Sequence, residues 1–199
     1  MDSLDLTKKT FGAVTAHHDA GETSPVRTVK REHGELLFYA IQGELPAIPA
    51  FEHILKLYSL KREGAVMPCR KAFSFRDMRG WHSSFFLIDF ESDLSDGRVS
   101  ILGEMYRTLF SGILRQNMRV SEMKSEALEG VSGYFRDLLT GPYVGRYRGN
   151  VPHAGREHVA VDILDLPVLD EKGEPRYLMS FVREIPKRTS ILRGVAVGQ

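Results

Sequence analysis

Three strand-like segments follow one another on the C-terminal side of the chain, and they constrain its fold most. Residues 143–150 (YVGRYRGN), 158–169 (HVAVDILDLPVL) and 176–184 (RYLMSFVRE) show the two-residue alternation of a β-strand. The turn segment 170–173 (DEKG) connects the second and third, which predicts a hairpin. Strands joined by so short a turn pair antiparallel, so this region predicts an antiparallel sheet.

Two further strand candidates lie in the middle of the chain. Residues 84–90 (SFFLIDF) form a short apolar run rich in phenylalanine, and residues 98–104 (RVSILGE) form a second run. The turn-rich segment 91–97 (ESDLSDG) separates them, which predicts another hairpin. The chain therefore predicts five strands in two groups.

Helices are expected over residues 50–62 and 125–139. The first has apolar residues at i, i+3, i+4 and i+7, namely Phe51, Ile54, Leu55 and Tyr58. The second has the apolar stripe Leu128, Val131, Phe135, Leu138 and Leu139. The order helix, two strands, helices and three strands predicts an α+β fold: a five-stranded antiparallel sheet, helices covering one face, and an N-terminal helix.

The chain divides into four parts by composition. Residues 1–34 are polar and are expected to be a flexible N-terminal tail. Residues 35–64 contain an apolar patch, ELLFYAIQG, and the first helix, so they predict a segment that packs on the body or on a second subunit. Residues 65–185 are expected to form the domain proper, and the basic residues 186–199 a C-terminal tail.

Composition limits the classes of protein. The chain has 199 residues, which suits one domain with tails, and its net charge of +1 argues against a strongly basic nucleic-acid binder. Its single cysteine excludes a disulfide framework. It has neither an apolar run of bilayer length nor an N-terminal apolar segment, which predicts a cytoplasmic protein with no membrane partner.

The segment from about Phe51 to Glu184 resembles a family of short PAS-like proteins of the PAS superfamily, common in alphaproteobacteria. The matching stretches, in order, are FEHILKLYSLKREG, MPCRKAFSFRDMRGW, FFLIDF, RVSILGE, FSGILRQNMRVSEM and HVAVDILDLPVLDEKGEP. The family commonly has Gly-Thr after the second strand, where this chain has Gly103-Glu104. The resemblance implies a PAS-like fold that binds a small molecule or cofactor between sheet and helices, or binds partner proteins and dimerises.

A ligand pocket of this kind would be apolar. Its expected lining residues are Phe86, Ile88, Ile101, Met105, Phe110, Met118, Leu128, Phe135, Val161 and Met179. The alternative is a plain hydrophobic core without a ligand. The expected homodimer contact is the stripe Phe51, Ile54, Leu55 and Tyr58 of the N-terminal helix.

Catalytic and metal signatures are absent from the sequence. It contains no G-x-S-x-G, no phosphate loop and no H-E-x-x-H, so the chain is expected not to be an enzyme. Cys69 and His82 share one loop, and His153 and His158 flank a turn, but no four-ligand metal set results. The cofactor stays unknown. The resemblance implies an axial histidine on or near the long helix for haem, and the predicted helix 125–139 has none. It implies a cysteine in the middle helices for a flavin adduct, whereas the single cysteine, Cys69, precedes the first strand.

Arginines and aromatics at 70–81 offer a second function. Arg70, Arg76 and Arg79 alternate there with Phe73, Phe75 and Trp81, a mixture that can bind nucleic acid. The alternative is a solvated face or ion pairs with Asp77, Asp89 and Glu91, which the near-neutral net charge favours.

The prediction is a PAS-type sensory or regulatory protein that binds a small apolar ligand or a signalling protein and acts as a homodimer. The competing hypotheses are a nucleic-acid-linked regulator, an interaction adaptor without a ligand, and an enzyme, which would need at least two titratable residues converging in the cavity.

Overall fold

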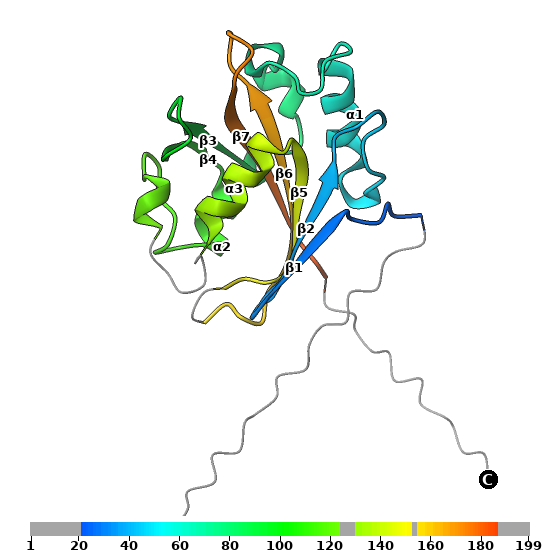
Figure 1. Ribbon diagram of the computed structural model, residues 1–199. Helices are drawn as coiled ribbons and strands as arrows, with labels where there is room; N and C mark the ends of the chain where they lie inside the picture. Colours follow the sequence, from blue (N-terminus) through cyan, green and yellow to red (C-terminus); the bar gives the residue numbers. More distant parts are fainter. Residues whose placement is uncertain (1–20, 124–129, 153–154, 187–199) are drawn as a thin grey trace, which may run out of the picture.

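The structure is a computed structural model that describes residues 21–123, 130–152 and 155–186 (Figure 1). Its centre is a seven-stranded sheet in the order β1-β2-β5-β6-β7-β3-β4, and every neighbouring pair is antiparallel. The strands are β1 Arg27–Arg31, β2 Gly34–Ala40, β3 Phe85–Phe90, β4 Gly97–Leu102, β5 Tyr143–Asn150, β6 Ala160–Leu169 and β7 Pro175–Glu184.

Three α-helices accompany the sheet in the described residues. They are α1 Glu52–Lys61, α2 Glu104–Leu109 and α3 Val131–Thr140. Short 3₁₀ turns occur at Pro49–Phe51, Arg70–Ala72, Phe75–Met78, His82–Ser84 and Val120–Glu122. Pro49 opens the turn that leads into α1, in keeping with the preference of proline for a first helical turn. The expected helix at 125–139 is found as α3 from Val131, and residues 125–129 lie outside the described residues.

The predicted α+β fold with an antiparallel sheet is confirmed, but the sheet has seven strands instead of five. The extra strands are β1 and β2, which pair with each other and extend the sheet beyond β5. Residues 27–31 were expected in a flexible tail because RTVKR is almost wholly polar. In β1 only Val29 is partly buried, so this strand is held by its ladder to β2 and not by an apolar face of its own.

Helices cover both faces of the sheet, not one. The buried cluster that includes Phe38, Ile163 and Val182 packs under α2 and α3, whereas Leu164 and Phe181 on the other face pack against α1. In Figure 1, α3 crosses the front of the sheet.

The residues expected at a dimer interface belong to the core of a single chain. The exposed fractions of Phe51, directly before α1, and of Ile54, Leu55 and Tyr58 in α1 are 0%, 1%, 5% and 0%, because this stripe packs on the sheet. The Tyr58 hydroxyl also donates to the carbonyl of Pro167 in β6 at 2.5 Å. These four side chains therefore have no surface to share with a second subunit.

Candidate functional site

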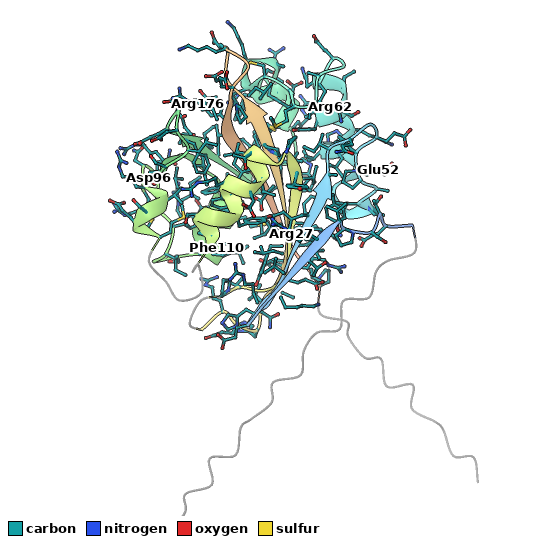
Figure 2. All side chains as sticks on the ribbon, viewed as in Figure 1. Arg27, Glu52, Arg62, Asp96, Phe110 and Arg176 are labelled. Atoms are coloured by element: carbon teal, nitrogen blue, oxygen red, sulfur yellow. The ribbon has the colours of Figure 1, made fainter. Side chains whose placement is uncertain are left out.

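A cavity of about 310 Å³ lies between the sheet and the helices α2 and α3. This volume falls within the usual range of small-molecule sites. The lining is mainly apolar and aromatic and consists of Arg31, Glu32, His33, Leu36, Phe86, Tyr106, Phe110, Leu114, Met123, Val131, Tyr134, Phe135, Tyr147, Pro152, Ile163, Asp165 and Ser180. Figure 2 draws the side chains around α2 and α3 and labels Phe110 near α2.

The turn between β1 and β2 closes one side of the cavity. Arg31, Glu32 and His33 line it. The Tyr147 hydroxyl shares its one proton between the carbonyl of Asn150 at the end of β5 (2.7 Å) and that of His33 in the turn (3.2 Å). Arg27 holds the same hairpin to α3, because its guanidinium lies over the ring of Phe38 and bonds to Asp137 at 2.6 Å. The N-terminal hairpin is therefore part of the wall of the site.

Four polar side chains form a connected group on the cavity wall. Tyr134 Oη donates to Asp165 Oδ2 at 2.8 Å, and Ser180 Oγ donates to Asp165 Oδ1 at 2.5 Å. The hydroxyls of Tyr106 and Ser180 are 2.5 Å apart. Since the Ser180 proton is used toward Asp165, Tyr106 must donate to Ser180. One path of hydrogen bonds runs from Tyr106 on α2 through Ser180 on β7, and the other comes from Tyr134 on α3. Both paths end on the carboxylate of Asp165.

Strand register brings this group together. Gly145, Asp165, Ser180 and Phe86 are consecutive partners across β5, β6, β7 and β3. Gly145 leaves room above the sheet for α3: a Cβ built on it would lie 2.2 Å from the hydroxyl of Tyr134. The small residue beside Asp165 is what allows a tyrosine from a helix to reach the carboxylate.

Burial dominates the electrostatics of the group. It raises the pKa of Asp165 to about 6, although the hydrogen bonds from Ser180 and Tyr134 act in the opposite direction. Burial, reinforced by the negative charge of Asp165, also raises the pKa of Tyr106 and Tyr134 far above the ordinary tyrosine value. Both phenols are therefore protonated donors at neutral pH, and Asp165 is the group that titrates near neutrality.

The expected pocket residues divide between cavity, core and surface. Phe86, Phe110 and Phe135 line the cavity. The others do not line it. Ile88, Met118 and Val161 are buried in the core on the same side of the sheet, and Met105 is partly buried beside that core. Ile101 is 37% exposed, Met179 belongs to the core on the α1 side, and Leu128 lies outside the described residues.

Sequence reasoning missed the polar residues of the site. Asp165 is in phase with Val161 and Ile163 on the inner face of β6, and Ser180 is in phase with Leu178 and Val182 on β7. A carboxylate at an inward position of an apolar strand is unusual enough to have been singled out. Met179 was misplaced for the related reason that it is one residue out of phase with Ser180.

The other candidate sites hold no ligand set in the described residues. No three histidine, cysteine, aspartate or glutamate side chains there could share a metal ion. Cys69 Sγ donates to the carbonyl of Asp170 at 3.3 Å, and His82 stacks on Phe75 with ring centroids 4.0 Å apart. His153 lies outside the described residues.

The arginine-rich segment 70–81 does not present a row of aromatic rings. Phe73 is buried, and Trp81 packs beside Phe51 and Phe181, whereas Phe75 is 77% exposed. The nearby acids do form ion pairs, but with other cations: Asp77 with Lys61, Asp89 with Arg176, and Glu91 with Arg119.

Comparisons with known proteins show weak similarity to sensor domains. No family model and no curated protein matches the chain significantly. A sensory box sensor histidine kinase from Vibrio cholerae is 13% identical with a TM-score of 0.39, over 53% of this chain and 82% of that one. A domain assigned to a light and redox sensing histidine kinase from Haloarcula marismortui is 16% identical with a TM-score of 0.36, over 56% and 97%.

A third solved structure is an RNA-binding light-oxygen-voltage receptor, 10% identical with a TM-score of 0.39. The match covers 76% of this chain but only 38% of the receptor. At these scores the comparisons add nothing to the description of the site, and membership of an alphaproteobacterial PAS-like family stays a prediction. None of the helices within the described residues combines the length and apolarity needed to span a membrane.

Proposed function

We propose that this chain is a PAS-type regulatory domain that binds a small molecule in the cavity between its sheet and the helices α2 and α3. The observation that carries the proposal is the cavity itself, with mostly apolar walls and one connected polar group (Asp165, Tyr134, Ser180 and Tyr106). An apolar pocket with a few convergent polar groups is the usual form of a ligand site.

The regulatory part of the proposal rests on the elements that share the cavity. A ligand there would contact the β1–β2 turn at Arg31–His33 and also α3 through Val131, Tyr134 and Phe135. Arg27 already joins the same two elements through Asp137. Occupancy would therefore bias the position of the N-terminal hairpin relative to α3, which is a surface that a partner or second subunit can detect.

Native mass spectrometry of the protein purified from its own host tests the proposal. We expect extra mass that is released on denaturation. Ile163→Phe, which narrows the cavity, is expected to lose that mass, whereas Ile101→Phe on the partly exposed face of β4 is the matched control and should keep it. The same spectrum reports whether the chain is the expected homodimer, which would have to use surface other than the buried stripe of α1.

Absence of bound mass in every variant, together with a defined complex, would favour the interaction adaptor instead. Retention of the extra mass by both variants alike would mean that the ligand binds elsewhere.

A second candidate function, a small-molecule enzyme, is favoured by one observation. Three titratable side chains, Asp165, Tyr134 and Tyr106, converge on the cavity, and Asp165 has a pKa of about 6. A carboxylate near its pKa at working pH suits a general base, with phenols as donors to developing negative charge. Incubating the recovered ligand with protein in D₂O tests this, because base catalysis at carbon exchanges C–H for C–D. Exchange that is lost in Asp165→Asn supports an enzyme; a ligand unchanged by the wild-type protein rejects it.

A further inference from the structure

Two aspartates of β6 have opposite partners. Asp162 lies on the sheet face opposite the cavity and pairs with the guanidinium of Arg146, whereas Asp165 faces the cavity and pairs with hydroxyls. Both are buried, at 3% exposure each. Within the described residues, no salt bridge includes Asp165, and the cation that neutralises its neighbour lies on the far side of the sheet.

The carboxylate of Asp165 also has hydrogen-bonding capacity left. An ionised carboxylate can accept about four hydrogen bonds, and each oxygen of Asp165 accepts one from the protein in the described structure. A donor pair from a ligand would meet two oxygens in a fixed plane. A buried carboxylate without a positive partner costs folding free energy. A cationic group bound at this point would therefore gain more binding free energy than a neutral hydrogen-bond donor would.

The rest of the cavity suits an unsaturated or aromatic body. Phe86, Phe110 and Phe135 line it together with Leu36 and Ile163. Arg31, the arginine of the lining, belongs to the β1–β2 turn, so a ligand anion would find its cation there and a carboxylate at Asp165. No three histidine, cysteine, aspartate or glutamate side chains of the described residues could share a bare metal ion.

We propose that the ligand of this cavity is an organic cation, with a flat apolar body between the phenylalanines and an amidinium or protonated amine head bound to Asp165. The proposal rests on the proposed function and narrows it to one ligand class. Tyr134 and Ser180 act as positioning residues, because their hydroxyls fix the plane of the carboxylate from α3 and β7.

Three probes of equal shape test the class: 2-naphthamidine, 2-naphthamide and 2-naphthoate, which are cationic, neutral and anionic at pH 7.5. Binding to the full chain is measured by calorimetry or ligand-observed NMR. We expect the amidine to bind at least about tenfold more tightly than the amide, and the naphthoate to bind least.

Asp165→Asn is the informative variant, since it keeps the shape of the side chain and removes its charge. The Asn amide can donate to Ser180 if the Ser180 hydroxyl turns toward Tyr106, so the group stays hydrogen-bonded. We expect this variant to lose the preference for the amidine while still binding the amide. Asp89→Asn, on the partly exposed Arg176 pair, is the matched control and should change neither affinity.

The outcomes separate the two proposals. Equal binding of amidine and amide, or tighter binding of the naphthoate, overturns the cationic class. An identified native ligand that lacks a cationic group overturns the class as well but leaves the proposed function standing. No binding of any probe, together with no bound native compound, overturns both.

Discussion

The guanidinium of Arg146 and the carboxylate of Asp162 form a two-point ion pair inside the protein, on the sheet face opposite the cavity. Arg146 Nε lies 2.7 Å from Asp162 Oδ1 and Nη2 lies 2.8 Å from Oδ2. Nη1 of the same arginine bonds to Glu22 Oε1 at 3.1 Å, which ties the start of the described chain to β5. Burial alone would lower the pKa of Arg146, but the hydrogen bond and charge of Asp162 outweigh it and raise the pKa.

Replacing this arginine should be among the most damaging single changes. Arg146→Ala leaves the buried carboxylate of Asp162 without its cation, which is expected to cost about 3–5 kcal/mol of unfolding free energy. Arg176→Ala is the matched control, because the Arg176–Asp89 pair is over a third exposed and its loss is expected to cost about 0–1 kcal/mol. Urea unfolding followed by circular dichroism measures both. Equal losses would show that the buried pair contributes no more than the exposed one.

A methyl group on Gly145 should damage the candidate site through Tyr134. The added Cβ would lie 2.2 Å from the Tyr134 hydroxyl and 2.6 Å from a methyl of Leu138, so α3 must shift. We expect Gly145→Ala to lower stability by about 1–3 kcal/mol, as overpacked cores do, and to weaken ligand binding. Gly133→Ala on the exposed side of α3 meets nothing within 4 Å and should stabilise by about 0.5–1 kcal/mol. Thermal unfolding of the two variants measures both changes. The prediction is contradicted if Gly145→Ala and Gly133→Ala shift the stability in the same direction.

Stability should fall as pH rises through the titration of Asp165. Burial raises its pKa from 3.8 to about 6, so between those values the folded protein holds a proton that the unfolded chain has released. The stabilisation is complete below about pH 4 and lost above about pH 6, and it amounts to roughly 3 kcal/mol. The neighbouring phenols of Tyr134 and Tyr106 stay protonated throughout.

Asp165→Asn removes this titration, so the variant can serve as the reference for the wild-type protein at each pH. The difference in unfolding free energy between variant and wild type is expected to move in favour of the variant as pH increases from 4 to 7. Using the difference cancels the contributions of other carboxylates such as Asp96, whose pKa is low at about 2. A difference that is flat across this range would mean that Asp165 titrates at an ordinary pKa.

The β1–β2 hairpin should loosen when Arg27 is removed. Arg27→Ala loses the exposed ion pair with Asp137 and the contact with the buried ring of Phe38, so total stability is expected to drop by only about 1 kcal/mol. Amide exchange in Arg27–Arg31 should nevertheless become faster, because this strand pairs on one side only. Lys56→Ala, which breaks an exposed pair within α1, is the control and should leave β1 exchange unchanged. Unchanged exchange in Arg27→Ala would show that the ladder to β2 alone holds the strand.

Sequence patterns predicted the parts of the fold that carry their own apolar alternation. The three C-terminal strands and the hairpin of β3 and β4 were found within two residues of their bounds, since each buries side chains on at least one face. β1 was missed because it buries almost nothing, and a strand stabilised mainly by backbone pairing leaves little trace in composition. The separation of α1 from α2 and α3 by the sheet depends on long-range packing that no local period encodes.

The candidate site was predicted only in its general place. Apolar residues from both sides of the sheet looked equivalent in sequence, so Met179 was grouped with Phe86 although they face opposite ways. The meeting of Asp165, Ser180 and Tyr134 requires the register of β5, β6 and β7 together with the position of α3. Asp165 alone stands out, as a carboxylate at an inward position of an apolar strand, whereas Ser180 and Tyr134 resemble ordinary strand and helix residues. Only the three-dimensional arrangement brings the three to one cavity wall.

The two edge strands of the sheet, β4 and β1, limit how copies of this protein can associate. On one side, Asn117 and Met118 already exchange backbone hydrogen bonds with Val99, so the outer edge of β4 is occupied at this residue. On the other side, β1 carries Arg27, Lys30 and Arg31 along a five-residue strand, and two such strands side by side would bring like charges together. Continuous sheets built across molecules, and the fibrils that grow from them, are thereby disfavoured at both ends.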